Sequence, residues 1–171
     1  PFYADSEVAV VGINTARSLT IKDGRINVRQ LEAATEKFSH MSEEITRVVV
    51  THHPFEGLDL ESDEGIVGRA DLAMDAFSRS GVDVILSGHQ HLHRTGSSAR
   101  RYLIDGYAAL LIQAGTAVSS RLRHAANSFN IIRIEHPRIS VECRAWQPSR
   151  AVFEISASYS FRHGPGGWQA A

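Results

Sequence analysis

The sequence predicts an α/β fold, α+β when the chain is taken as a whole, and two observations predict it. Up to about residue 93, short apolar runs rich in valine and isoleucine alternate with segments of helical periodicity. Beyond that point, short alternating runs follow one another with tight turns between them. Helical crossovers in the first half imply parallel pairing of its strands.

The first half contains three expected strands and two expected helices. Strands are expected over residues 7–13 and 45–51, and an apolar run that begins at Val82 ends at His89. A helix over 28–40 has Leu31, Ala34 and Phe38 at helical spacing. A second helix over 69–80 is expected to bury one face, made of Leu72, Ala73, Ala76 and Phe77.

The second half is expected to form antiparallel strands. Their expected ranges are 102–105, 108–114, 128–134, 139–146 and 152–160, and Asp105-Gly106 is a predicted turn between the first two. The glycine-rich residues 162–171 are expected to form a loose tail. Residues 1–161 then belong to one domain, which the length of 171 residues suits.

Composition excludes several classes of function. The net charge is −1, with both signs scattered along the chain, so no nucleic-acid or membrane surface is indicated. Cys143 is the only cysteine, and no apolar run approaches the ~20 residues of a membrane span. We expect a cytoplasmic protein. The chain begins at Pro1 and enters a strand almost at once, and we expect it to be the later part of a longer polypeptide.

Two strand ends carry histidine. The run 48–50 leads into Thr51-His52-His53-Pro54, and the run 82–87 leads into Gly88-His89-Gln90-His91. Parallel α/β folds place their chemistry at such strand tips. Gly88 would let the chain turn so that the two later imidazoles reach two nearby points, which suits a pair of metal ions. The alternative is that these histidines are hydrogen-bonded core residues, but the same layout at two strand tips favours metal ligation.

At these residues the sequence resembles the calcineurin-like metallophosphoesterases, in particular the branch of bacterial cyclic-nucleotide and glycerophosphodiester phosphodiesterases. The two motifs are His-His-Pro at 52–54 and Gly-His-x-His at 88–91, and weaker similarities lie at 23–31 and 115–121. The resemblance extends to about residue 147. It implies the C-terminal part of a four-layer αββα sandwich and a metal-dependent phosphohydrolase that acts on phosphodiesters or phosphomonoesters.

The resemblance also implies a ligand set. His52 and His89 would bind one ion and His91 the other, while His53 would support a ligand or face the substrate. Imidazoles accept manganese, iron, zinc or cobalt, so the ligand type does not select the metal. His93 is expected to be structural. Arg121 and Arg123 are either phosphate-facing or simply solvated.

The early motifs of the family are absent from this sequence. No Asp-x-His, Gly-Asp-x-x-Asp or Gly-Asn-His-Asp/Glu occurs in it. We therefore expect the full-length protein to be an enzyme and this chain alone to be inactive, with too few ligands for tight binding. A truncated or split scaffold module of the same fold is the main alternative. A mononuclear zinc hydrolase is disfavoured, because adjacent residues such as His52 and His53 face opposite sides of a strand.

Partners follow from the same expectations. The substrate would be a small phosphoester, and the acidic segment 56–65 would lie at the mouth of the site and influence substrate choice. Without the opening strands of the family fold, apolar sheet surface would stay uncovered. We therefore expect a homo-oligomer.

Overall fold

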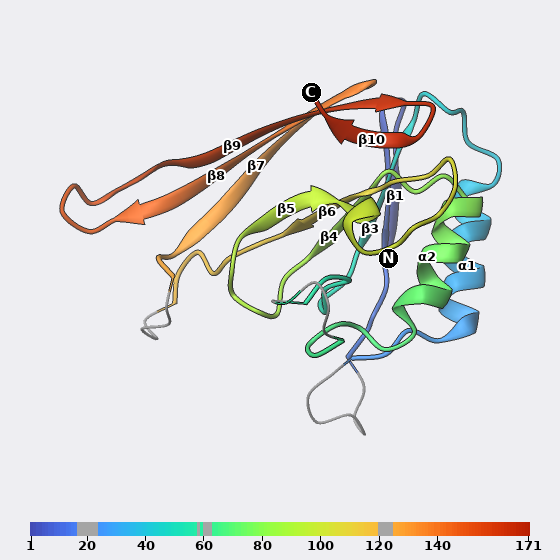
Figure 1. Ribbon diagram of the computed structural model, residues 1–171, viewed down its shortest axis with the longest axis horizontal. Coiled ribbons are helices and arrows are strands. Elements are labelled where there is room, and N and C mark those ends of the chain that lie inside the picture. The colour runs from blue at the N-terminus through green and yellow to red at the C-terminus, as the bar shows by residue number, and fades with distance from the viewer. Residues whose placement is uncertain (17–23, 58, 60–62, 120–124) are drawn as a thin grey trace.

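Two β-sheets pack face to face in a computed structural model of the chain, and two helices cover the outer face of the first sheet (Figure 1). The structure describes residues 1–16, 24–57, 59, 63–119 and 125–171. These residues supply three layers, helices, sheet and sheet, of the expected αββα sandwich.

The first sheet has the strand order β1-β2-β3-β4-β6-β5. Neighbouring strands from β2 to β6 pair in parallel, as the helical crossovers predict, while β1 and β5 add antiparallel edges. The strands are β1 Phe2–Ala4, β2 Val8–Gly12, β3 Thr46–Val50, β4 Val84–Ser87, β5 Arg94–Ser97 and β6 Leu110–Gln113. The two edge strands, β1 and β5, were not among the expected elements.

Both predicted helices are confirmed. Helix α1 spans Val28–Phe38 and begins at Asn27, which forms a capping box with Gln30. Helix α2 spans Ala70–Arg79. The prediction that Leu72 belongs to the buried face of α2 is wrong, because Leu72 is 43% exposed. The buried face is the stripe formed by Ala70, Ala73, Met74 and Phe77, whose 3–4 residue spacing leaves Leu72 to one side.

The second sheet is antiparallel, with the order β10-β9-β8-β7. Its strands are β7 Ser128–Glu135, β8 Arg138–Gln147, β9 Val152–Gly164 and β10 Gly167–Ala170. The first three lie where the sequence predicts them. In Figure 1 they project well beyond the first sheet at the end opposite to β10.

The expected loose tail over 162–171 is wrong, because these residues complete β9 and form β10. Trp168 is only 1% exposed, and its backbone N–H donates to the Ala108 carbonyl at 2.8 Å. Gly167 has φ +84°, and a Cβ there would lie 2.2 Å from the Ala108 nitrogen. The glycines therefore permit a tight hairpin and a close backbone approach rather than flexibility.

The expected strand over 102–105 is also wrong. A short 3-10 helix, η1, covers Ser98–Arg100, and residue Ile104 makes only an isolated bridge to Tyr107. The Asp105-Gly106 turn between these two residues is confirmed, with the Tyr107 N–H donating to the Ile104 carbonyl at 3.2 Å. The buried hydroxyl of Tyr102 explains the difference, since it donates to the Phe55 carbonyl and ties this segment to a loop instead of a sheet.

Two apolar cores hold the layers together. One joins the helices to the first sheet and includes Leu31, Phe38, Val49, Phe77 and Ile85. The other joins the two sheets and consists of Val48, Val84, Leu110, Ile112, Ile139, Val141, Phe161 and Trp168. Among the described residues, no helix has the length and apolar character needed to span a membrane.

Candidate metal centre

The two histidine motifs lie side by side, at the C-terminal ends of neighbouring parallel strands. Strand β3 ends at Val50 and β4 ends at Ser87, with Val50 paired to Leu86. The Gly88 N–H then donates to the His52 carbonyl at 3.1 Å, so the backbone joins the two turns directly. This is the edge of the sheet at which the sequence predicts the site.

Three imidazoles converge at this edge. The ligand atoms of His52, His53 and His89 all lie within 4.8 Å of one another. His89 Nδ1 and His52 Nε2 are 3.1 Å apart, and the ring centroids of the three residues are separated by 4.5–5.0 Å. The structure thus brings His52 and His89 together, and their sharing of one ion stays a prediction.

The expectation that His52 and His53 face opposite sides of a strand is wrong. Their ring centroids are 4.8 Å apart, with the rings at 88° to each other. Strand β3 stops at Val50, and both histidines lie in the bend that follows it, where the two-residue alternation of a strand no longer applies. His53 therefore belongs to the same imidazole cluster as His52.

His53 is the most enclosed member of the cluster, at 6% exposure. Its Nδ1 lies 2.8 Å from the hydroxyl of buried Thr15, which also accepts the His53 backbone N–H at 3.3 Å. On the other side, a Cβ at Gly24 would lie 2.0 Å from His53 Nδ1. The Thr15 hydroxyl thus holds the ring through Nδ1, and the tautomer of His53 decides which of the two groups donates.

His91 is not a member of this three-histidine cluster, and its predicted part as ligand of a second ion stays a prediction. Its Nδ1 is 2.6 Å from the Thr116 hydroxyl, the kind of support that orients a metal-binding imidazole. The turn that carries it is strained at the histidines themselves, since φ is +71° at His89 and +61° at His91. The Gln90 N–H donates to the Gly88 carbonyl at 2.9 Å, which closes a three-residue turn around His89.

His93 belongs to the space between the sheets. Its Nε2 lies 3.4 Å from the Tyr159 hydroxyl, and burial lowers the pKa of this imidazole. Asp83, for which the sequence suggests no catalytic role, is buried and accepts the Arg47 backbone N–H at 2.7 Å and the Trp168 indole N–H at 2.8 Å. Burial raises the pKa of Asp83, and these two donors oppose the rise.

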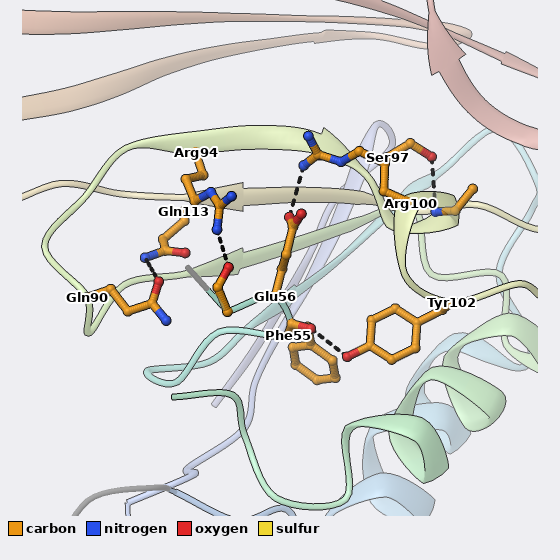
Figure 2. Close-up of polar contacts among 10 residues, drawn as sticks. Phe55, Glu56, Gln90, Arg94, Ser97, Arg100, Tyr102 and Gln113 are labelled. Carbon is orange, nitrogen blue, oxygen red and sulfur yellow. Dashed lines mark hydrogen bonds and ion pairs between the residues drawn. The ribbon is translucent and has the colours of Figure 1, made fainter. Parts of the chain in front are cut away.

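The segment expected at the mouth of the site is tied to β5 and η1. Arg100 pairs with Glu56 at 2.9 Å, Arg94 donates to the Gly57 carbonyl, and Arg101 pairs with Asp63. Figure 2 shows the first two of these contacts. Residues 58 and 60–62 of this segment lie outside the described part of the chain, as do Arg121 and Arg123.

The donor set fits a first-row transition metal. Metal–nitrogen bonds of about 2.0–2.1 Å place two imidazole nitrogens on one ion about 2.9–3.4 Å apart. The 3.1 Å between His52 Nε2 and His89 Nδ1 lies in this range. The same distance is that of a hydrogen bond between the two rings, so the donor set could hold a metal, and the ligand type selects none among zinc, iron, manganese and cobalt.

Three supporting residues, Thr15, Gly24 and Thr116, were not identified from the sequence. Thr15 and Thr116 contact imidazole nitrogens, and Gly24 leaves room for one of the rings. Gly24 and Thr116 do fall within the weaker family similarities at 23–31 and 115–121, which were the available signal. Thr15 carries no such signal, because only the fold brings it to His53.

Comparisons with known proteins identify the fold. No family model matches the chain, and no curated protein does. Among solved structures, the chain is similar to PhoD with a TM-score of 0.73 at 8% identity, over 100% of this chain and 43% of PhoD. It is similar to GAP50, the anchor in the inner membrane complex of Plasmodium, with a TM-score of 0.60 at 13% identity, over 95% and 52% of the two chains.

A dimetal phosphatase from Danio rerio is similar with a TM-score of 0.50 at 16% identity, over 71% of this chain and 36% of the phosphatase. The chain thus spans about half, or less, of the length of each of these proteins. Its two packed sheets, its helices and its strand-tip histidines agree with this likeness. The chain has the calcineurin-like metallophosphoesterase fold.

Proposed function

We propose that the protein is a metal-dependent phosphoesterase that hydrolyses a phosphodiester or phosphomonoester at a dinuclear site. The observation that carries the proposal is the convergence of His52, His53 and His89 at adjacent strand tips. The likeness to a dimetal phosphatase supports it at the level of fold. The substrate would be a small phosphoester, since the chain is close to neutral and its charges of both signs are scattered along the sequence.

Each histidine has a distinct part in this proposal. His52 and His89 would hold one ion through the nitrogens that lie 3.1 Å apart, and His91 would hold the other, oriented by Thr116. When bound, two divalent ions generate hydroxide from water at neutral pH and neutralise charge on the phosphoryl oxygens. The part of the protein itself is to fix the imidazoles in place before substrate arrives.

His53 is suited to the substrate side of the reaction. It is buried, and Thr15 holds its Nδ1, so the ring has one set orientation. If the Thr15 hydroxyl accepts from Nδ1–H, Nε2 can bind a ligand; if the hydroxyl donates to Nδ1, Nε2 carries a proton that can pass to a leaving oxygen. In both tautomers His53 acts at the cluster it shares with His52 and His89.

The remaining ligands would come from the early motifs that this sequence does not contain. The chain supplies imidazoles for the two ions, whereas a bridging carboxylate is what normally holds such a pair together. The 171 residues alone should therefore bind metal weakly and turn over slowly. Hydrolysis is a property we propose for the full-length protein.

The test is an assay of the full-length protein with manganese, against bis-p-nitrophenyl phosphate and cyclic AMP. The His89→Ala variant should lose at least about 100-fold in kcat/KM, because it removes one of the two close nitrogens of an ion. His136→Ala is the matched control, since His136 is exposed and packs against His163 and Trp168 rather than the cluster. Equal activity of wild type and His89→Ala would refute the proposal.

A second candidate is a non-catalytic interaction module of the same fold. The likeness to GAP50, described as an anchor, favours it, as does the absence of the early motifs. The same assay separates the two candidates, since an anchor requires no metal and no turnover. A full-length protein that is inactive toward both substrates and unaffected by His89→Ala would favour the module.

A further inference from the structure

A small cavity lies directly behind the two histidine-bearing turns. It is lined by Pro54, Phe55, Glu56, Ile85, Ser87, Arg94, Leu111 and Gln113. Pro54 follows His53 in the chain, and Ser87 lies two residues before His89. The cavity wall is therefore continuous with the backbone that presents both imidazoles.

Gln113, which also lines the cavity, contacts the turn that carries His89 and His91. Gln113 of β6 donates from Nε2 to the Gln90 side-chain oxygen at 3.0 Å, and Gln90 lies between His89 and His91 (Figure 2). A change in the packing of the cavity would therefore move both histidine-bearing turns.

Glu56 is the unusual member of the wall. It is 4% exposed, and its Oε2 accepts from Arg100 Nη2 at 2.9 Å. Its Oε1 is buried and has no hydrogen-bond partner among the described residues. A buried carboxylate oxygen without a hydrogen-bond donor destabilises the folded protein. We therefore expect a donor group to occupy the cavity beside Oε1.

The size and charge of the cavity select that partner. The space open to the centre of a water-sized sphere is about 10 Å³, which is room for one water molecule. Arg94 lines the same cavity and Arg100 already neutralises the carboxylate, so an additional cation is disfavoured. The lone pairs of Oε1 repel an anion, whereas a water can donate to them.

The same segment is held at three successive residues. Tyr102 donates to the Phe55 carbonyl, Arg100 pairs with Glu56, and Arg94 donates to the Gly57 carbonyl (Figure 2). Phe55 and Gly57 are held through their backbone carbonyls, whereas Glu56, which lines the cavity, is held through its side chain. Its ion pair with Arg100 therefore fixes the segment that directly follows the His52-His53 turn.

We propose that Glu56 is a positioning residue of the metal centre, whose buried carboxylate holds one ordered water in this cavity and, with Arg100, fixes the turn that presents His52 and His53. The inference rests on the proposed function for its effect on metal binding. Glu56→Gln keeps the size of the side chain but replaces one carboxylate oxygen with an NH2 group, which donates and cannot accept, so the acceptor for either Arg100 or the water is lost.

The first experiment is a cobalt titration of the full-length protein, monitored through the visible d–d absorption band of bound cobalt. It is carried out at a temperature well below the unfolding midpoint of every variant. Glu56→Gln should weaken cobalt binding by about 10-fold, the low end of the effect of support residues on metal affinity. Asp63→Asn is the control, because it neutralises another ion pair of the same segment whose carboxylate is 87% exposed. Its cobalt affinity should equal that of wild type.

The second experiment needs no metal. In the metal-free protein, Glu56→Gln should shift the imidazole signals of His52 and His53 in NMR spectra and leave those of His136 and His163 in place. A crystal structure should show one water within hydrogen-bond distance of Glu56 Oε1. Unchanged imidazole signals with wild-type cobalt affinity, or a dry cavity, would overturn the inference. A full-length wild-type protein that binds no cobalt would overturn the proposed function alone, because the imidazole signals still decide whether Glu56 positions the turn.

Discussion

His53 fits into its place because Gly24 has no side chain. A Cβ at position 24 would lie 2.0 Å from His53 Nδ1 and 2.5 Å from the Thr15 carbonyl oxygen. Neither neighbour can move away easily, since His53 is buried and bonded to Thr15. Gly24 is therefore needed because it leaves room for the His53 ring, and not because of its backbone conformation.

Gly24→Ala should destabilise the protein by about 1–3 kcal/mol, the usual cost of forcing a methyl group into a packed site. It should also displace the His53 ring and weaken metal binding. Urea unfolding of the metal-free protein and a cobalt titration measure the two effects.

Gly88→Ala is the matched control, because Gly88 flanks the other histidine turn but a Cβ there meets nothing within 4 Å. It should cost less than about 1 kcal/mol. Equal losses in the two variants would show that the close approach at Gly24 does not matter.

At the residue scale, the sequence was informative where side chains follow a strand. The apolar runs that end in His52 and His89 predict two neighbouring strand tips, and the parallel sheet brings them together. The turns themselves could not be predicted, because the positive φ values fall on His89 and His91 instead of on Gly88. Contacts such as Thr15 with His53 join residues 38 positions apart, and only the fold determines them.

The last strand, β10, ties the second sheet to the first. Trp168 lies in the core between the sheets, and its indole N–H donates to Asp83 at the start of the β4 segment. Trp168→Ala should cost about 3–5 kcal/mol of unfolding free energy through lost packing alone. Urea unfolding would measure it, and a loss below 1 kcal/mol would mean that β10 is dispensable.

Trp168→Phe separates the hydrogen bond from the packing. It keeps a ring in the core but leaves Asp83 with one donor fewer, and burial already raises the pKa of this carboxyl. Because the lost donor favours the ionised form, the folded-state pKa should rise further. The loss of stability should then be small below the usual pKa of an aspartate and grow as the pH rises through the folded-state value. A pH-independent loss would contradict this reading.

At the element scale, long periodic segments were predictable and short or glycine-rich ones were not. Helix α1 and strands β3, β7 and β8 lie where their patterns place them. Strands β1, β5 and β10 have three or four residues each and lack the aliphatic run that marks the equally short β4 and β6. Tertiary contacts stabilise the last two of these strands, with Trp168 holding β10 and Arg94 holding β5.

The second sheet has an apolar area on its outer face. Phe129, Trp146, Phe153 and Ile155 form this outer patch, with ring centroids of Phe153 5.0 Å from Phe129 and 5.2 Å from Trp146. Cross-strand pairing places Trp146 opposite Phe153, and Ile155 opposite Arg144, on the face that turns away from Val141 in the core. Phe129 is 36% exposed and Ile155 is 54% exposed. Aromatic and aliphatic side chains gathered in this way are typical of a contact surface.

The edge of the same sheet is open to another copy of the chain. Strand β7, at the edge, has eight residues and contains neither proline nor lysine, the residues that commonly protect an edge. The net charge of −1 gives little repulsion between copies. A second copy could therefore approach this side of the sheet and pack its own outer patch against the first.

We predict on these grounds that the 171-residue chain forms a homodimer through the outer patch. Light scattering should give twice the chain mass of 18.8 kDa. Ile155→Lys places a charge in the patch and should shift the protein to monomer, whereas Leu103→Lys, at a position that is 91% exposed and away from the patch, should not. A wild-type chain that stays monomeric at high concentration would show that the outer face is stable in water without a second copy.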